Sequence, residues 1–171
     1  PSNAKVHSYP LYEKYGLIWI WMGNTALADH HDIFEIKHYD NPSWGINRGD
    51  AMELECNYLL MCDNLLDPTH VAWVHAGSFG QAATKSAPLR VKKTNDGVIV
   101  HRWMMDVEPA PFYKKVVGFN GNCDRLQHYE VRYPSNALIK AIFTPAGTGG
   151  SEGKLHDDVF IMDSYNFMTP V

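Results

Sequence analysis

Residues 58–75 read YLLMCDNLLDPTHVAWVH. Apolar side chains recur there at spacings of three and four, which is typical of a helix with one face packed on a sheet. Pro68 lies inside the stretch. Either the helix kinks at this point, or Asp67 caps a second helix whose first turn contains Pro68. This segment is the main helical element of the expected fold.

The rest of the chain is dominated by two-residue alternation and by β-branched or aromatic runs, which indicate strands. A turn at 94–97 and another at 134–136 each predict a hairpin, with a positive φ at Gly97. Turns this frequent favour an antiparallel sheet. The predicted fold class is therefore α+β, a helix laid against a largely antiparallel sheet, with no clear domain boundary. The strands are expected at residues 16–22, 34–39, 52–57, 89–93, 98–103, 126–133, 138–144 and 159–168.

Composition narrows the functional class. The 171 residues are 45% hydrophobic and 20% charged, an ordinary globular profile. The net charge of −4 argues against a nucleic-acid partner. The longest apolar run, residues 16–22, is far shorter than the roughly 20 residues that span a bilayer, so no membrane segment is expected. Three cysteines with no close pair predict a reduced, cytoplasmic chain.

The helical stretch carries a candidate metal site, with five polar residues: Asp63, Asn64, Asp67, His70 and His75. Asn64 and Asp67 are three residues apart, as are Asp67 and His70, so each pair shares a helix face. Two neutral imidazoles and a carboxylate suit non-haem Fe(II), which needs open coordination positions. Alternatively, Asp67 accepts a hydrogen bond from the second nitrogen of a ligand histidine. On spacing alone, ordinary packing explains these residues about as well.

His70 and His75 are five residues apart, about 140° around an ideal helix. Both can reach one metal only if the helix bends, widens or ends between them. Pro68 before them and Gly77 after them make that irregularity plausible. Structural zinc is a poor alternative, because the stretch offers no cysteine pair. A second histidine pair, at 30–31, lies in a polar loop and is expected to be solvated surface rather than a converged metal cluster.

The spacing Asp63-x3-Asp67-x2-His70-x4-His75 resembles the iron-binding motif in the catalytic domain of Rieske non-haem iron oxygenases. The resemblance extends along nearly the whole chain. Residues 13–23 are similar to the strand that leads from the Rieske domain into that catalytic domain. Residues 57–71 and 164–171 are similar to the vanillate O-demethylase group of monooxygenases within the family.

The resemblance implies roles for individual residues. His70 and His75 would be ligands of a mononuclear Fe(II), and Asn64 would lie beside the iron. Asp67 would connect a ligand histidine to the Rieske-ligating histidine of a neighbouring subunit, which implies a homotrimer. The implied fold is a helix-grip (START-like) domain, in which an antiparallel sheet wraps a helix around an apolar pocket.

Two further residues are pocket candidates in such a sheet. Met104 and Phe112 follow a strand and precede or lie in a proline-rich turn. Met and Phe are common in the walls of apolar ligand pockets. Packing in the protein core is the alternative for both.

Two family elements are absent from the sequence. No cysteine has the Cys-x-His or Cys-x2-His spacing of a Rieske cluster. The family's third iron ligand, an aspartate, is expected past Val171, although Asp157, Asp158 and Asp163 are carboxylates within the chain. We therefore expect residues 1–171 to be part of a catalytic domain, with the Rieske domain and the final helix outside this chain.

The function that these expectations imply is O2-dependent monooxygenation, with O-demethylation of a small, vanillate-like methoxybenzoate favoured. Electrons would come from NAD(P)H through a separate reductase or ferredoxin component, then a [2Fe–2S] cluster, then Fe(II). Aromatic-ring dihydroxylation on the same iron site is one alternative. A helix-grip domain that binds a hydrophobic ligand without catalysis is the other.

Overall fold

The computed structural model describes residues 4–150 and 156–169. The chain divides into two compact units, residues 1–53 and 54–171, a division that the sequence pattern does not reveal. In the first unit, β1 (Leu11–Lys14) and β2 (Leu17–Ile20) form an antiparallel hairpin. The strand expected at 34–39 is wrong. Those residues form turns instead, in which the N–H of Tyr39 donates to the Ile36 carbonyl.

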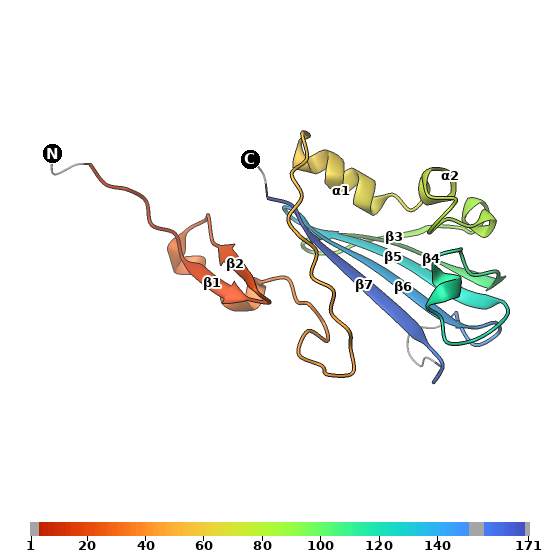
Figure 1. Ribbon diagram of the computed structural model, residues 1–171. Helices are drawn as coiled ribbons and strands as arrows, with labels where there is room; N and C mark the ends of the chain where they lie inside the picture. The colour runs from red at the N-terminus through yellow and green to blue at the C-terminus, as the bar shows by residue number, and fades with distance from the viewer. Residues whose placement is uncertain (1–3, 151–155, 170–171) are drawn as a thin grey trace. The chain divides into compact units, whose positions relative to one another are not determined.

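The second unit is built on a five-stranded antiparallel sheet (Figure 1). Its strands are β3 (Arg90–Lys93), β4 (Gly97–Val107), β5 (Cys123–Arg132), β6 (Asn136–Pro145) and β7 (Phe160–Phe167). Their order in the sheet is β3-β4-β5-β6-β7, and each strand pairs with its neighbour in the chain, so the sheet is a meander. The α+β prediction is therefore confirmed. None of the helices in the described part of the chain has the length and apolar character of a membrane span.

Helix α1 (Tyr58–Leu66) lies across one face of this sheet (Figure 1). Its buried Cys62 packs on Val131 of β5 and Ala137 of β6. We call this face of the sheet the inner face. Side chains alternate along a strand, so Arg125, Gln127 and Tyr129 share the inner face with Val131. A second core cluster contains Ala110, Tyr113, Cys123, Ala141 and Phe143. Its sheet residues lie on the same face, because Phe143 is paired with Arg125 and Ala141 with Gln127.

Two separate helices occupy the 58–75 stretch. The Asn57 side chain accepts a hydrogen bond of 2.9 Å from the Leu59 N–H and so caps α1. The helix ends because Asp67, which precedes a proline, takes extended angles of φ −96° and ψ 98°. Helix α2 (Val71–Val74) begins only after His70. Neither expected alternative is therefore right, since the chain does not continue through a kink and Asp67 does not cap α2. The strand expected at 52–57 is also wrong, because this segment leads into the α1 cap without strand pairing.

The β3–β4 hairpin forms as predicted, but the role of its glycine differs. Gly97 is the first residue of β4 and is not among the positive-φ residues of the described chain. A Cβ atom at Gly97 would lie 2.0 Å from the Val131 carbonyl oxygen. Glycine is required here because the neighbouring backbone is so close.

Candidate metal centre

The two histidines lie at opposite ends of α2. His70 directly precedes the helix and His75 directly follows it, so the helix is only four residues long. Their ring centroids are 5.3 Å apart with an interplanar angle of 64°. Both histidines were expected to reach one metal only if the helix bends, widens or ends between them. The structure shows the last of these, because α2 ends at Val74, and the two imidazoles lie close together.

Asp67 lies next to His70 in the link between the helices. Its Oδ2 is 3.4 Å from Nδ1 of His70. Its Oδ1 accepts a 2.7 Å hydrogen bond from the Thr69 N–H and another from the Thr69 hydroxyl. Burial acts to raise the pKa of Asp67, but the hydrogen bonds from Thr69 and the contact with His70 outweigh it and lower that pKa. An ionised Asp67 facing Nδ1 leaves Nε2 of His70 as the nitrogen free for a metal.

A glycine fixes the backbone after the second histidine. The Gly80 N–H donates a 2.8 Å hydrogen bond to the His75 carbonyl. A Cβ atom at Gly80 would lie 2.3 Å from the carbonyl oxygen of Val71, so no side chain fits there. A Cβ at Gly77 would meet nothing within 4 Å. The glycine that shapes this segment is thus Gly80 rather than Gly77.

The expected pocket residues lie in different environments. Phe112 is 38% exposed, and its ring centroid is 5.0 Å from that of Phe79. Phe79 in turn lies 6.2 Å from the His75 ring, edge to face. Phe112 therefore belongs to an aromatic group that reaches a candidate ligand. Met104 is 2% exposed and packs within the protein core, in register with Arg125.

Asn64 lies on the last turn of α1 with its side chain exposed. Its carbonyl accepts a 3.3 Å hydrogen bond from the Asp67 N–H. Asn64 thus contacts the link that carries Asp67 through its backbone.

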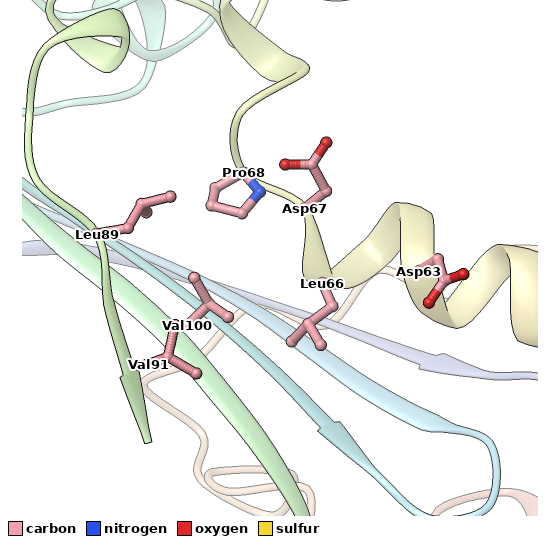
Figure 2. A pocket seen from close by; sticks show the side chains of 7 residues that line it. All are labelled: Asp63, Leu66, Asp67, Pro68, Leu89, Val91 and Val100. Carbon is pink, nitrogen blue, oxygen red and sulfur yellow. The ribbon is translucent and has the colours of Figure 1, made fainter. Parts of the chain in front are cut away.

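An open apolar depression of about 300 Å³ lies beside Asp67, between the end of α1 and the edge formed by β3 and β4 (Figure 2). Figure 2 shows Leu66 and Val100 pointing into it, with the Asp67 carboxylate directed away from its floor. Neither Met104 nor Phe112 lines it. The lining residues are Asp63, Leu66, Asp67, Pro68, Leu89, Val91 and Val100.

Asp163 is unsuited to be a third ligand of this site. It pairs with Lys140 in the β6–β7 register, on the face of the sheet opposite α1, and its Oδ2 is 3.4 Å from Lys140 Nζ. Asp157 and Asp158 are exposed residues just before β7. Among the described residues, none of these carboxylates joins His70 and His75 in a set of three closely spaced ligand atoms.

The loop at 29–32 differs from expectation. Asp29, His30 and His31 bring their ligand atoms within 4.8 Å of one another, so the adjacent residues do converge. All three are exposed, however, and Asp29 Oδ1 already accepts a 2.9 Å hydrogen bond from the His31 N–H as the cap of a 3₁₀ turn. Local turn geometry accounts for the cluster.

Three buried polar residues on strands β4 and β5, next to the segment that carries the histidines, were not predicted from the sequence. Arg102, Arg125 and Gln127 are 3%, 1% and 1% exposed on the inner face of the sheet. Nε of Arg102 donates a 2.7 Å hydrogen bond to Gln127 Oε1. The alternation of side chains along β5 could have revealed two of them. Arg125 and Gln127 fall on the same face of the strand as the buried Tyr129 and Val131.

The fold is that of the helix-grip catalytic domain of Rieske oxygenases. The chain belongs to the family of vanillate O-demethylase oxygenase C-terminal domains, whose model matches residues 54–171. The family match confirms the predicted resemblance to the catalytic domain of Rieske oxygenases.

Individual relatives agree with this assignment. The chain is 38% identical, over 85% of its length, to a vanillate O-demethylase oxygenase subunit of Pseudomonas sp. (strain HR199 / DSM 7063), of which it covers 42%. It is 34% identical, over 90% of its length, to an iron-sulfur subunit of a toluene-4-sulfonate monooxygenase system of Comamonas testosteroni, of which it covers 45%. The chain thus spans less than half the length of these relatives.

A solved structure supports the fold over the whole chain. The crystal structure of dicamba monooxygenase bound to 3,6-dichlorosalicylic acid matches with a TM-score of 0.83 and 25% identity. The match covers 99% of this chain and 48% of that one. The helix-grip prediction is therefore confirmed.

The donor set fits ferrous iron. Two imidazoles at the two ends of one short helix leave coordination positions open, as a non-haem Fe(II) site requires. The carboxylate at Nδ1 of His70 is the partner that commonly fixes the tautomer of a metal-ligating histidine. Among the described residues, no cysteine joins the two histidines in a set of three closely spaced ligand atoms.

Proposed function

We propose that this chain is the catalytic portion of an oxygenase component that uses Fe(II) to oxidise a small, acidic aromatic molecule, with O-demethylation of a methoxybenzoate favoured. The observation that carries this proposal is the arrangement of His70 and His75 at the two ends of α2, with Asp67 at Nδ1 of His70. Membership of the vanillate O-demethylase oxygenase family supports the reaction class.

In this proposal His70, through Nε2, and His75 hold the Fe(II), and a further ligand comes from outside the described residues. When bound, the iron supplies the activation of dioxygen. The Nδ1–H of His70 donates a hydrogen bond to the Asp67 carboxylate, which keeps that ring in one tautomer and one orientation. Oδ1 of Asp67 is held by the Thr69 N–H, which fixes the orientation of the carboxylate.

The substrate ring would be held near His75 by Phe79 and Phe112, whose edge-to-face contact offers an apolar wall. In the overall reaction a methoxyarene, O2, two electrons and two protons give a phenol, formaldehyde and water. The relatives are named for vanillate, toluene-4-sulfonate and dicamba. These names support an acidic aromatic as the substrate class.

The electrons would come from NAD(P)H by way of a reductase or ferredoxin component and a [2Fe–2S] cluster. Asp67 would be the entry point to the mononuclear site from a neighbouring subunit of a homotrimer. The open apolar depression beside Asp67, with exposed Leu89 and Val91 at its edge, suits a contact with another protein surface. We further propose that the protein acts in the cytoplasm.

The experiment that tests the proposed function uses the complete natural polypeptide, reconstituted anaerobically with Fe(II) and supplied with its reductase. Vanillate should yield protocatechuate and formaldehyde in equal amounts, and His70→Ala should abolish both. Ring-dihydroxylated product without formaldehyde would favour the dioxygenase alternative. Tight binding of aromatic acids with no iron retained would favour the non-catalytic alternative.

A further inference from the structure

Two buried arginines lie on the inner face of the sheet behind the segment that carries the histidines. Arg102 is on β4 and Arg125 on β5, and Arg102 is in register with Gln127, two residues from Arg125. Among the described residues, neither guanidinium forms an ion pair with a carboxylate. Burying an unpaired charge is costly, so hydrogen bonds to other groups must compensate.

Arg102 is bonded to the chain before the first histidine. Its Nη2 donates a 3.0 Å hydrogen bond to the Pro68 carbonyl, two residues before His70. Its Nη1 donates to the Thr84 carbonyl at 2.5 Å. Its Nε donates to Gln127 of β5. The guanidinium therefore connects the start of the histidine-bearing segment to both β4 and β5 by hydrogen bonds.

Arg125 is bonded to the chain after the second histidine. Its Nη1 donates a 3.1 Å hydrogen bond to the Phe79 carbonyl, four residues after His75, and a 2.6 Å hydrogen bond to Oε1 of Gln81. Its guanidinium also stacks 4.9 Å from the centroid of the Tyr113 ring. A planar group with several fixed donors can hold backbone carbonyls in this way, whereas a lysine ammonium cannot reproduce the geometry.

We propose that Arg102 and Arg125 are positioning residues that hold the two ends of segment 68–81 on the sheet, and so keep His70 and His75 at the spacing that one metal ion needs. This inference rests on the proposed function, because it supposes a metal between the histidines. The helix between them spans only four residues, so it cannot by itself fix where both ends of the segment lie.

The test compares Arg102→Lys and Arg125→Lys with Arg90→Lys, a matched change at an exposed position on β3. In each complete polypeptide, the Fe(II) dissociation constant is measured by chelator competition, and the nitric oxide adduct of the Fe(II) site is examined by EPR. The melting temperature of the iron-free protein reports stability separately. We expect both buried variants to weaken Fe(II) binding at least tenfold and to alter the EPR signal, while Arg90→Lys changes neither.

A lower melting temperature with an unchanged dissociation constant and EPR signal would overturn the positioning role, since it would show a purely structural one. If a lysine variant does not fold, Gln81→Ala and Gln127→Met decide in its place, because each removes one partner of an arginine and leaves the arginine itself. We expect each to weaken Fe(II) binding severalfold, and unchanged binding in both would overturn the inference.

If the unmodified protein holds no iron that His70→Ala removes, the proposed function itself fails. If the unmodified protein binds iron through His70, and the arginine variants have the same Fe(II) dissociation constant and EPR signal, only the positioning role is refuted.

Discussion

Oδ2 of Asp67 lies 3.4 Å from Nδ1 of His70, in the link where α1 has ended and α2 has not yet begun. The proline at position 68 keeps Asp67 out of the helical conformation, and Thr69 then holds its other oxygen. A carboxylate and an imidazole three residues apart are thereby fixed in contact without a continuous helix. The local chain conformation therefore holds the carboxylate next to Nδ1 of His70.

Asp67→Asn should separate iron binding from electron delivery. The amide oxygen of Asn can still accept from the Thr69 N–H, so the link keeps its shape, but the negative charge at His70 is lost. We expect the protein to retain iron and turnover to fall by about ten- to a hundredfold. The measurement is rapid-mixing oxidation of the reduced [2Fe–2S] cluster, followed by absorbance.

Asp96→Asn is the control for this change, because Asp96 is an exposed carboxylate in the turn between β3 and β4 and does not line the depression beside Asp67. It should leave the oxidation rate unchanged. Equal rates in Asp67→Asn and the unmodified protein would show that Asp67 has no part in electron delivery.

Gly80→Ala should disrupt the candidate metal centre. The new Cβ would lie 2.3 Å from the Val71 carbonyl oxygen, which must then move together with α2. We expect a loss of more than about 2 kcal/mol in the free energy of unfolding, measured by urea titration, together with weaker iron binding. Gly77→Ala, which meets nothing within 4 Å, should change stability by less than about 1 kcal/mol. Equal effects of the two substitutions would contradict the close approach at Gly80.

Much of the fold could be predicted because runs of apolar, β-branched and aromatic residues bounded by turn residues indicate strands. The segments 126–133 and 138–144 are such runs on either side of the turn at 134–136, and both lie largely within strands of the central sheet. At 34–39 two-residue alternation misled, since local hydrogen bonds form turns and His38 takes a φ of 65°. Two-residue alternation alone does not distinguish a paired strand from an irregular segment.

The candidate site was only partly predictable, for a different reason. The spacing of Asp67, His70 and His75 pointed to iron through a family resemblance, whereas periodicity left the geometry open. The short helix between the histidines follows from Pro68 and from the close packing at Gly80, and only the second of these needs three-dimensional information. Partners distant in the chain, such as Arg102 and the Pro68 carbonyl, leave no periodic trace in either segment.

The lowered pKa of Glu130 should make the stability of the fold depend on pH, independently of any metal. Hydrogen bonding from His128 lowers the pKa of Glu130 to about 2, aided by Arg132, despite the opposing effect of burial. Because this pKa is lower in the folded state than in the unfolded state, the ionised carboxylate stabilises the fold above about pH 4.5. That contribution is lost as the pH falls from about 4.5 toward 2.

Glu130→Gln should therefore lower the free energy of unfolding by roughly 2 kcal/mol at pH 7 and by progressively less toward pH 3. Urea titrations of the two proteins across this range measure the difference. Glu108→Gln, at a side chain that is 72% exposed, is the control and should show no such trend. A constant difference from pH 7 to pH 3 would be inconsistent with the depressed pKa.

Phe112→Ala should affect the substrate rather than the metal. Removing a half-exposed ring that contacts Phe79 opens the apolar wall near His75. We expect KM for a methoxybenzoate to rise about tenfold with iron content unchanged. Val116→Ala changes a side chain of similar exposure (40%) on the neighbouring turn, and should leave KM as it is. An unchanged KM in Phe112→Ala would place the substrate elsewhere.

The most direct test of the central claim is the iron-to-protein ratio of the complete polypeptide, purified without oxygen, beside its His70→Ala variant. The account predicts about three iron atoms per polypeptide, two in a [2Fe–2S] cluster and one at the histidines, and about two in the variant. The same ratio in both proteins, or no iron after Fe(II) reconstitution, would contradict a metal centre at His70 and His75.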